Sequence, residues 1–104
     1  MNLNKNIDKI IETLKSIDVY KIFSVKVKDS DAPNYSKIIT NPIDLGTMKL
    51  KAKRNEYSQY VDFMDDVGLM RQNSEIYNSK THEVTFLACR LERKAEEEIA
   101  LINN

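Results

Sequence analysis

The chain has 104 residues, and its 16 Lys and Arg balance its 16 Asp and Glu, so its formal net charge is zero. This balance argues against direct nucleic-acid binding, which usually needs a basic excess, and one Cys with one His is too few for a disulfide or a zinc site. No run reaches the roughly 18 apolar residues of a membrane span, and residues 1–6 lack the apolar core of a signal peptide. We therefore expect a soluble intracellular domain with no membrane contact, no metal and no cofactor. In a reducing compartment Cys89 is expected to be a free thiol.

The scarcity of helix breakers indicates an all-α fold, because only two Gly and two Pro occur in the chain. A first helix is predicted from about Asn4 to Tyr20, since one apolar stripe recurs there at helical spacing: Leu3, Ile7, Ile10, Ile11, Leu14 and Ile17. A long ordered loop follows over 24–33. Val25 and Val27 alternate with Lys, but no second strand exists to pair with them, and loops of this length often carry function.

The next predicted elements are short. Residues 33–39 read as a helical turn that ends before Pro42, because the residue before a proline is pushed out of the helical region. Asp44 is then predicted to cap a helix from Leu45 to about Arg54, whose inner face is Leu45, Met48 and Ala52.

Two longer helices complete the chain. Ser58 is predicted to cap the first, which keeps an apolar stripe of Phe63, Val67, Met70 and Tyr77, with Gly68 as a weak point. Thr81 is predicted to cap the last, and its apolar set is Val84, Leu87, Ala88, Leu91, Ala95, Ile99 and Ile102. The charged face from Glu92 to Glu98 reads as solvated surface. Four helices with one long connection between the first and second predict a four-helix bundle.

The stretch from Met70 to Asn78 concentrates polar groups at a helix end. Asn73 and Tyr77 are four residues apart, so they share a helical face, and Asn78 follows where the helix gives way to Ser79. Asn78 has two interpretations. It either ends the helix in the left-handed conformation, or it turns its amide inward, where an NH₂ donor and a C=O acceptor would suit another amide.

Taken in order, the motifs of this chain resemble the bromodomain family. They are Phe23, Val27, Ala32-Pro33-Asn34-Tyr35, the stretch from Ile38 to Met48, Phe63, Asp66, Met70, Asn73 and Tyr77-Asn78. The resemblance covers nearly the whole chain and implies a single domain over 1–104. It implies a left-handed four-helix bundle whose long first loop, with the short loop after Asn78, forms a pocket for acetylated lysine.

By position, the resemblance implies that Asn78 donates its side-chain NH₂ to the acetyl carbonyl and that Tyr35 reaches the same oxygen through an ordered water. Val84 takes the gatekeeper position, and the expected lining is completed by Phe23, Val27, Ala32, Ser74 and Tyr77. Acetylation leaves lysine as a neutral amide, which an apolar pocket accepts while an unmodified ammonium would lose its hydration there.

Each of these side chains also has a structural interpretation. Phe23 and Val27 fit a plug at the end of the bundle, Tyr35 fits a packing aromatic, and Tyr77 fits the core. Asp44 and Asp66 are interpreted as a cap and a fold-supporting carboxylate, and His82 is given no role.

Several positions depart from the family pattern. Lys21-Ile22-Phe23 stands where Trp-Pro-Phe is frequent, and Lys26 replaces the usual Pro before Val27. These changes predict a poorer apolar shelf and a more mobile loop. We therefore expect weak binding of a single acetyl-lysine, with Kd in the high micromolar range or above, about −5 kcal/mol.

The resemblance implies a nuclear reader that takes part in transcription regulation and performs no chemistry. Its expected partners are acetylated histone H3 and H4 tails or other acetylated nuclear proteins, and it is expected to be a monomeric domain of a larger chromatin protein. The alternative is a protein-interaction bundle that keeps the fold but has lost acetyl-lysine binding. An enzyme is not expected, because no nucleophile and base pair, metal set or phosphate-binding glycine loop is recognisable.

Overall fold

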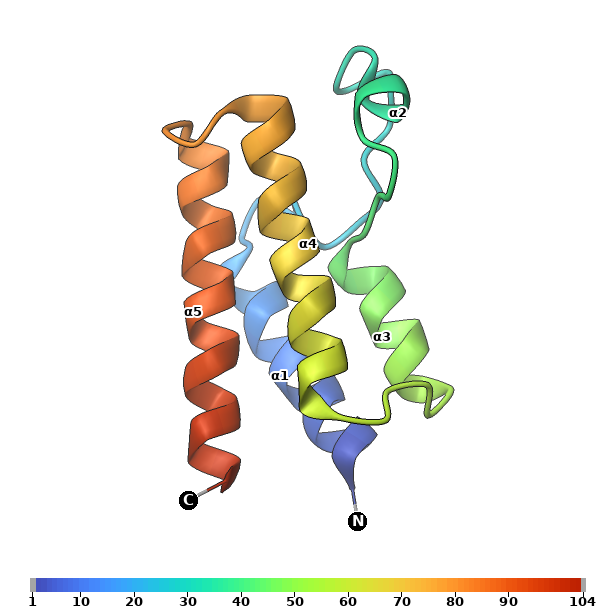
Figure 1. The fold of residues 1–104 in the computed structure, drawn as a ribbon, viewed down its shortest axis with the longest axis vertical. Helices are drawn as coiled ribbons and strands as arrows, with labels where there is room; N and C mark the ends of the chain where they lie inside the picture. The colour runs from blue at the N-terminus through green and yellow to red at the C-terminus, as the bar shows by residue number, and fades with distance from the viewer. Residues whose placement is uncertain (1, 104) are drawn as a thin grey trace.

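Four long helices and one short helix form the computed structural model, which describes residues 2–103 (Figure 1). The bundle consists of α1 (Leu3–Ile17), α3 (Leu45–Lys53), α4 (Tyr60–Asn78) and α5 (Glu83–Asn103). The short α2 (Tyr35–Ile38) lies in the long connection between α1 and α3. The described residues contain no strand, and the predicted all-α, left-handed four-helix bundle with its long first loop is confirmed.

The core of the bundle is one cluster of apolar side chains from all four long helices. Ile7, Ile11 and Leu14 of α1 are fully buried, as are Phe63 and Val67 of α4. α5 packs along α4, and α1 packs against α3 and α5. The predicted stripes therefore face the core with two exceptions: Tyr77 of α4 lies outside the core cluster, and the stripe of α5 ends at the half-buried Ile99 and leaves Ile102 exposed.

The first helix ends three residues earlier than predicted, at Ile17 instead of Tyr20. The cause is Asp18, whose buried carboxylate accepts hydrogen bonds from the backbone N–H groups of Ile22 (2.9 Å) and Phe23 (2.8 Å). These bonds bend the chain into a turn in which Lys21 has a positive φ of 56°. A side chain thus competes with the helix for the backbone, as Asp commonly does.

Two of the three predicted caps are wrong. α4 begins after Gln59, not Ser58, and the Gln59 N–H donates to Asp62 Oδ2 at 3.1 Å in a reciprocal capping box. α5 begins at Glu83, where the Nδ1 atom of His82, not the hydroxyl of Thr81, accepts from the Val84 N–H at 3.1 Å.

Asp44 caps α3 as predicted. Its carboxylate accepts from the Thr47 N–H at 3.2 Å and from the Thr47 hydroxyl at 2.6 Å. Asp66 supports the fold as predicted, because it accepts from the Tyr57 hydroxyl (2.7 Å) and pairs with Lys51 (2.6 Å).

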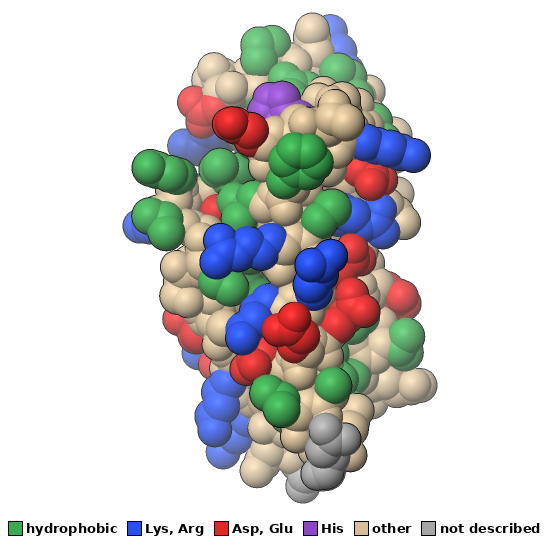
Figure 2. All heavy atoms as spheres, turned by 90° about the vertical axis from the view of Figure 1, so that its left-hand side faces the viewer, with side chains coloured by type: hydrophobic (Ala, Val, Ile, Leu, Met, Phe, Trp, Pro, Cys, Tyr) green, Lys and Arg blue, Asp and Glu red, His purple; other side chains and the backbone are tan. Residues whose placement is uncertain are grey.

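The outer face of α5 is charged and solvated, as its sequence predicts. Figure 2 shows side chains of both signs spread over this side of the molecule. Arg71 of α4 reaches Glu92 of α5 at 2.8 Å and links the two helices at the edge of that face. Among residues 2–103 no helix is long and apolar enough to cross a membrane.

Candidate functional site

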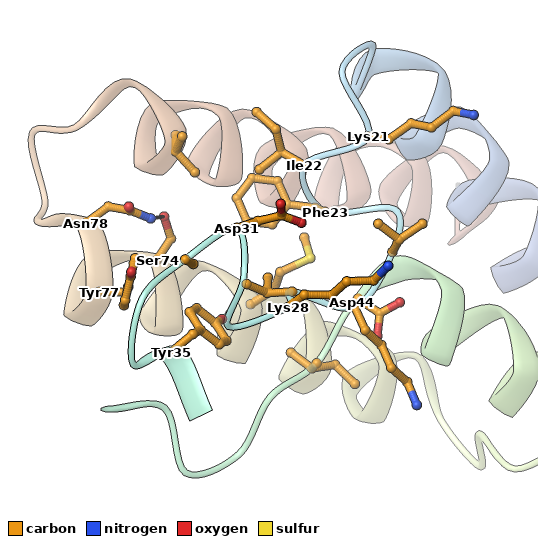
Figure 3. Close-up of a pocket in the computed structure, with 17 residues that line it drawn as sticks. Lys21, Ile22, Phe23, Lys28, Asp31, Tyr35, Asp44, Ser74, Tyr77 and Asn78 are labelled. Carbon is orange, nitrogen blue, oxygen red and sulfur yellow. Dashed lines mark hydrogen bonds between the residues drawn. The ribbon is translucent and has the colours of Figure 1, made fainter. Parts of the chain in front are cut away.

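A cavity of about 380 Å³ opens at one end of the bundle (Figure 3). This is the end that carries α2 and the connection between α4 and α5 in Figure 1. Its walls are the loop between α1 and α3, the last turns of α4 and the first turn of α5. All eight residues predicted for the site line this one cavity: Phe23, Val27, Ala32, Tyr35, Ser74, Tyr77, Asn78 and Val84. Residues as far apart in the chain as Phe23 and Val84 therefore meet at one cavity.

Asn78 is the last residue of α4 and does not terminate the helix in the left-handed conformation. The helix ends instead at its C-cap Ser79, which has a positive φ of 95° but an extended ψ of 161°, so the terminator interpretation of Asn78 is wrong. The side-chain NH₂ of Asn78 donates one hydrogen bond to Ser74 Oγ at 3.3 Å, one turn earlier (Figure 3). Within residues 2–103 its second N–H and its carbonyl oxygen have no partner, so both are available to a ligand.

A buried hydroxyl network holds the end of α4 against α5. Ser74 Oγ lies 2.9 Å from Thr85 Oγ1, and Thr85 Oγ1 lies 2.6 Å from the carbonyl oxygen of Ser79. Thr85 is fully buried and Ser74 nearly so. The network fixes the residues on both sides of Asn78 in the chain, and it thereby orients the Asn78 amide.

Two tyrosines form the opposite wall. The rings of Tyr35 and Tyr77 have centroids 5.0 Å apart and an interplanar angle of 59°. The Tyr77 hydroxyl donates to the carbonyl oxygen of Pro33 at 2.9 Å, which ties the loop to α4. Tyr77 is only half-buried and lies outside the core cluster, so it does not continue the core stripe of α4.

Tyr35 keeps its proton. Burial, and to a smaller extent the neighbouring Tyr77, raise the pKa of the Tyr35 hydroxyl above its ordinary value. In the part of the chain that the structure describes, no group accepts a hydrogen bond from this hydroxyl. It is therefore a neutral donor and acceptor on the wall that faces Asn78.

The loop that carries these groups is held at two points. At its start, Asp18 Oδ2 accepts from the Ser24 hydroxyl at 2.7 Å as well as from the Phe23 N–H. Farther along, Asp29 accepts from the backbone N–H (2.9 Å) and the hydroxyl (2.6 Å) of Ser36, next to Tyr35. The sequence interpretation did not identify either carboxylate, although both are short polar side chains of the type that accepts from nearby backbone N–H groups.

Asn73 does not belong to the cavity, contrary to the expectation that it shares one site with Tyr77 and Asn78. Its side chain is buried and donates to the carbonyl oxygen of Asn41 at 2.9 Å. It therefore anchors the segment before Pro42 to α4. Asn73 shares a helical face with Tyr77, but it lies one turn farther from the end of α4, and its side chain reaches Asn41 and not the cavity.

The apolar part of the cavity includes side chains beyond those predicted: Ile22, Ile43 and Met70. Phe23 is 8% exposed and forms the inner wall, whereas Val27 is 40% exposed and stands at the mouth. The mouth also carries charge from Lys21, Lys26, Lys28 and Asp31. Ile22 adjoins the motif residue Phe23, and Ile43 and Met70 belong to the motifs themselves, which is the sequence signal that could have identified them.

The chemistry available in this cavity is that of hydrogen bonding and apolar contact. Cys89 is exposed on α5 and does not line the cavity, and His82 uses Nδ1 to cap α5. Among the described residues no three His, Cys, Asp or Glu side chains are grouped to hold a metal.

Comparison with protein families gives one match. The model of the bromodomain family, described as "Bromodomain", matches residues 7–90, which include every residue that lines the cavity.

Similar proteins are found among both sequences and structures. A bromodomain-containing protein homolog of Drosophila melanogaster is 36% identical over 78 residues, or 75% of this chain and 6% of that protein. Transcription initiation factor TFIID subunit 1 of Oryza sativa subsp. japonica is 33% identical over 82 residues, or 79% of this chain and 4% of that protein. The chain thus spans only a small fraction of the length of these relatives.

The fold has a similar solved structure. The crystal structure of CpBRD2 from Cryptosporidium has a TM-score of 0.85 and 31% sequence identity, and the match covers 93% of this chain and 91% of that one.

Proposed function

The chain belongs to the bromodomain family, whose members are in general acetyl-lysine readers and not enzymes, and on that premise we propose that its cavity binds the acetylated lysine side chain of nuclear proteins. One observation carries the proposal: Asn78 presents an unpaired N–H and an unpaired carbonyl oxygen in a cavity whose walls are mostly apolar and aromatic. An amide ligand would satisfy the Asn78 N–H without bringing charge into the cavity.

The acetyl group would enter between the Asn78 wall and the Tyr35 wall. Its carbonyl oxygen accepts from Asn78 Nδ2 and, through a water, from the Tyr35 hydroxyl. Phe23 and Val27 contact the methyl group, and Val84 borders the opening from α5. Ala32, Ser74 and Tyr77 complete the surface, with Ser74 acting through its hydrogen bond to Asn78.

Selection against unmodified lysine follows from charge. A lysine ammonium in this cavity would lose its water, and the two carboxylates of the lining would compensate only in part, because both oxygens of Asp44 already accept from Thr47 and Asp31 is exposed at the mouth. The acetylated side chain carries no charge and avoids that cost. Binding should nevertheless be weak, with Kd in the high micromolar range, about −5 kcal/mol, because the mouth has exposed valines where a firmer apolar shelf would strengthen it.

The biological setting is proposed on the same premise. Acetylated histone H3 and H4 tails are the first ligands to test, followed by other acetylated nuclear proteins. Because the chain spans 4% and 6% of the two relatives compared above, we place this domain, as a monomer over 1–104, in a larger nuclear protein of chromatin or transcription. The function is recognition and not catalysis.

The test is an NMR titration of the ¹⁵N-labelled domain with acetylated and unmodified H4 tail peptides. Wild type should show shifts around Val27, Tyr35 and Asn78 with the acetylated peptide only. Asn78→Ala should remain folded and lose the response, whereas Gln72→Ala, which removes an exposed amide of the same helix, should keep it.

The competing function is a protein-interaction bundle that has lost acetyl-lysine binding, and the exposed, lysine-rich mouth favours it. If wild type fails to respond to a broad panel of acetylated peptides, the reader function is refuted and the interaction bundle replaces it.

A further inference from the structure

The mouth of the cavity carries an unbalanced positive charge. Lys21, Lys26 and Lys28 all border it and are exposed. The salt bridges within residues 2–103 involve other basic side chains: Lys15, Lys49, Lys51, Arg71 and Lys94. The three lysines of the mouth therefore have no carboxylate partner in the described part of the chain.

The carboxylates that line the cavity offset this charge only in part. Asp44 is buried and both its oxygens accept from Thr47, and Asp29 is engaged by Ser36. Asp31 is the other acidic side chain that borders the cavity, so the lining has three exposed lysines against the exposed Asp31 and the buried Asp44, an excess of one positive charge. In the loop after α4, Lys80 and Glu83 offset each other.

Lys21 and Lys28 also lie on one side of the site. In Figure 3, Lys28 runs along the cavity on the side away from Asn78, and Lys21 extends outward beyond it. A peptide whose acetyl-lysine is anchored at Asn78 leaves the cavity through the mouth that these lysines border, and exposed charges there act over a Debye length of about 8 Å. The chain as a whole is neutral, so this charge is local to the mouth.

We infer that the site prefers acetyl-lysine flanked by acidic residues over acetyl-lysine flanked by basic residues. The inference rests on the proposed function and adds the class of sequence that the site selects. Rim charges of opposite sign steer and retain a ligand, and like charges reject competitors. An acetylated site within a strongly basic segment is then a poorer ligand than one beside Glu or Asp.

The test compares three short peptides with one central acetyl-lysine and Glu, Ala or Arg on both sides, titrated into wild type by NMR. The Glu peptide should bind about three- to tenfold more tightly than the Arg peptide, which is the effect of two or three exposed ion pairs. The difference should shrink as salt is added. Lys26→Glu/Lys28→Glu should reverse the order, and the control Lys5→Glu/Lys53→Glu, which changes exposed lysines outside the cavity lining, should preserve it.

The other outcomes separate this inference from the reader function. Equal affinity for the three peptides, lost in Asn78→Ala, would overturn the charge preference and keep the reader. Binding of the Glu peptide without acetylation and without dependence on Asn78 would overturn both, and so would silence towards all three peptides.

Discussion

The Thr85 hydroxyl of α5 lies 2.6 Å from the carbonyl oxygen of Ser79, the residue that follows Asn78. It also lies 2.9 Å from Ser74 Oγ, which in turn accepts from the Asn78 amide. One fully buried side chain on the last helix thus fixes the chain before and after Asn78. Buried polar groups that are fully satisfied rigidify their surroundings, and here the group held in place is the candidate ligand-binding amide.

Replacement of Thr85 by Val should therefore weaken both the fold and the site. The valine leaves the Ser79 carbonyl without its hydroxyl donor, which should lower the free energy of unfolding by about 1–2 kcal/mol. Acetyl-peptide affinity should fall several-fold because Asn78 loses its support. Denaturant unfolding and the peptide titration measure the two effects.

Thr85→Ser is the matched control, because it keeps the hydroxyl and should retain affinity even if the lost methyl costs some stability. A Thr85→Val protein with wild-type affinity would show that the hydroxyl network does not orient Asn78.

Asp18 offers a second prediction, at the start of the loop. Its carboxylate accepts from two backbone N–H groups and from the Ser24 hydroxyl. Asp18→Ala would leave the buried donors of Phe23 and Ser24 unsatisfied, so we expect a loss of about 2–4 kcal/mol in the free energy of unfolding. The wall formed by Phe23 should loosen, and NMR line widths of residues 22–24 would report it.

Asp65→Ala is the control for Asp18→Ala, because Asp65 is an exposed aspartate of α4. Equal stabilities of the two variants in denaturant unfolding would contradict the role assigned to Asp18.

The fold could be predicted from the sequence because its apolar residues recur at the helical period. The apolar stripe of α1 and that of α4 through Met70 are buried where the helical period places them. The ends of the helices were harder to predict. Asp18, Gln59 and His82 decide three of them through side-chain contacts with the backbone, and apolar periodicity carries no information about such contacts.

The residues of the site were predicted from different information. The eight predicted positions came from resemblance to a family, and the structure brings them to one cavity. The residues that hold these positions in place, Thr85 and Asp29, were not predicted. Thr85 lies three residues before Ala88 on the buried face of α5, a place where a polar residue signals a buried hydrogen bond. Asp29 meets Ser36 only after the loop has folded back on itself, so sequence spacing does not reveal that contact.

Asp29 gives a prediction that depends on pH. The hydroxyl and then the backbone N–H of Ser36 lower the pKa of the Asp29 carboxyl from its ordinary value of 3.8. The native contact therefore favours the charged form, so it is fully present above pH 3.8 and is lost as the pH falls through the lowered pKa. In an acid titration the Ser36 amide resonance should move with a midpoint below 3.8.

Asp29→Asn should abolish that titration, and Asp29→Ala should free the start of α2 and weaken acetyl-peptide binding at neutral pH through Tyr35. A midpoint at or above 3.8 in wild type would show that the carboxylate does not hold Ser36 in solution.

The two glycines provide the last prediction, because they differ in what a methyl group would meet. A Cβ atom at Gly46 would lie 2.9 Å from Asp44 Oδ2 and 3.0 Å from the backbone oxygen of Ser24. Neither neighbour can yield easily, since Asp44 caps α3 and the Ser24 side chain is bound by Asp18. We expect Gly46→Ala to lower the free energy of unfolding by about 1–3 kcal/mol and to shift the cavity wall, because the Leu45 N–H donates to the Phe23 carbonyl at 2.8 Å.

Gly68→Ala is the matched variant on α4. There a Cβ atom would lie 3.3 Å from Glu92 Oε2, the end of a flexible side chain whose other oxygen pairs with Arg71. A small shift of that carboxylate accommodates the methyl group, so the gain in helix propensity, up to about 1 kcal/mol, should leave the protein equally or more stable. Thermal unfolding and the peptide titration of both variants test this prediction. Equal losses of stability in the two variants would contradict it, and so would unchanged peptide affinity in Gly46→Ala. Either result would show that the close contact between α3 and the start of the loop does not determine the cavity wall.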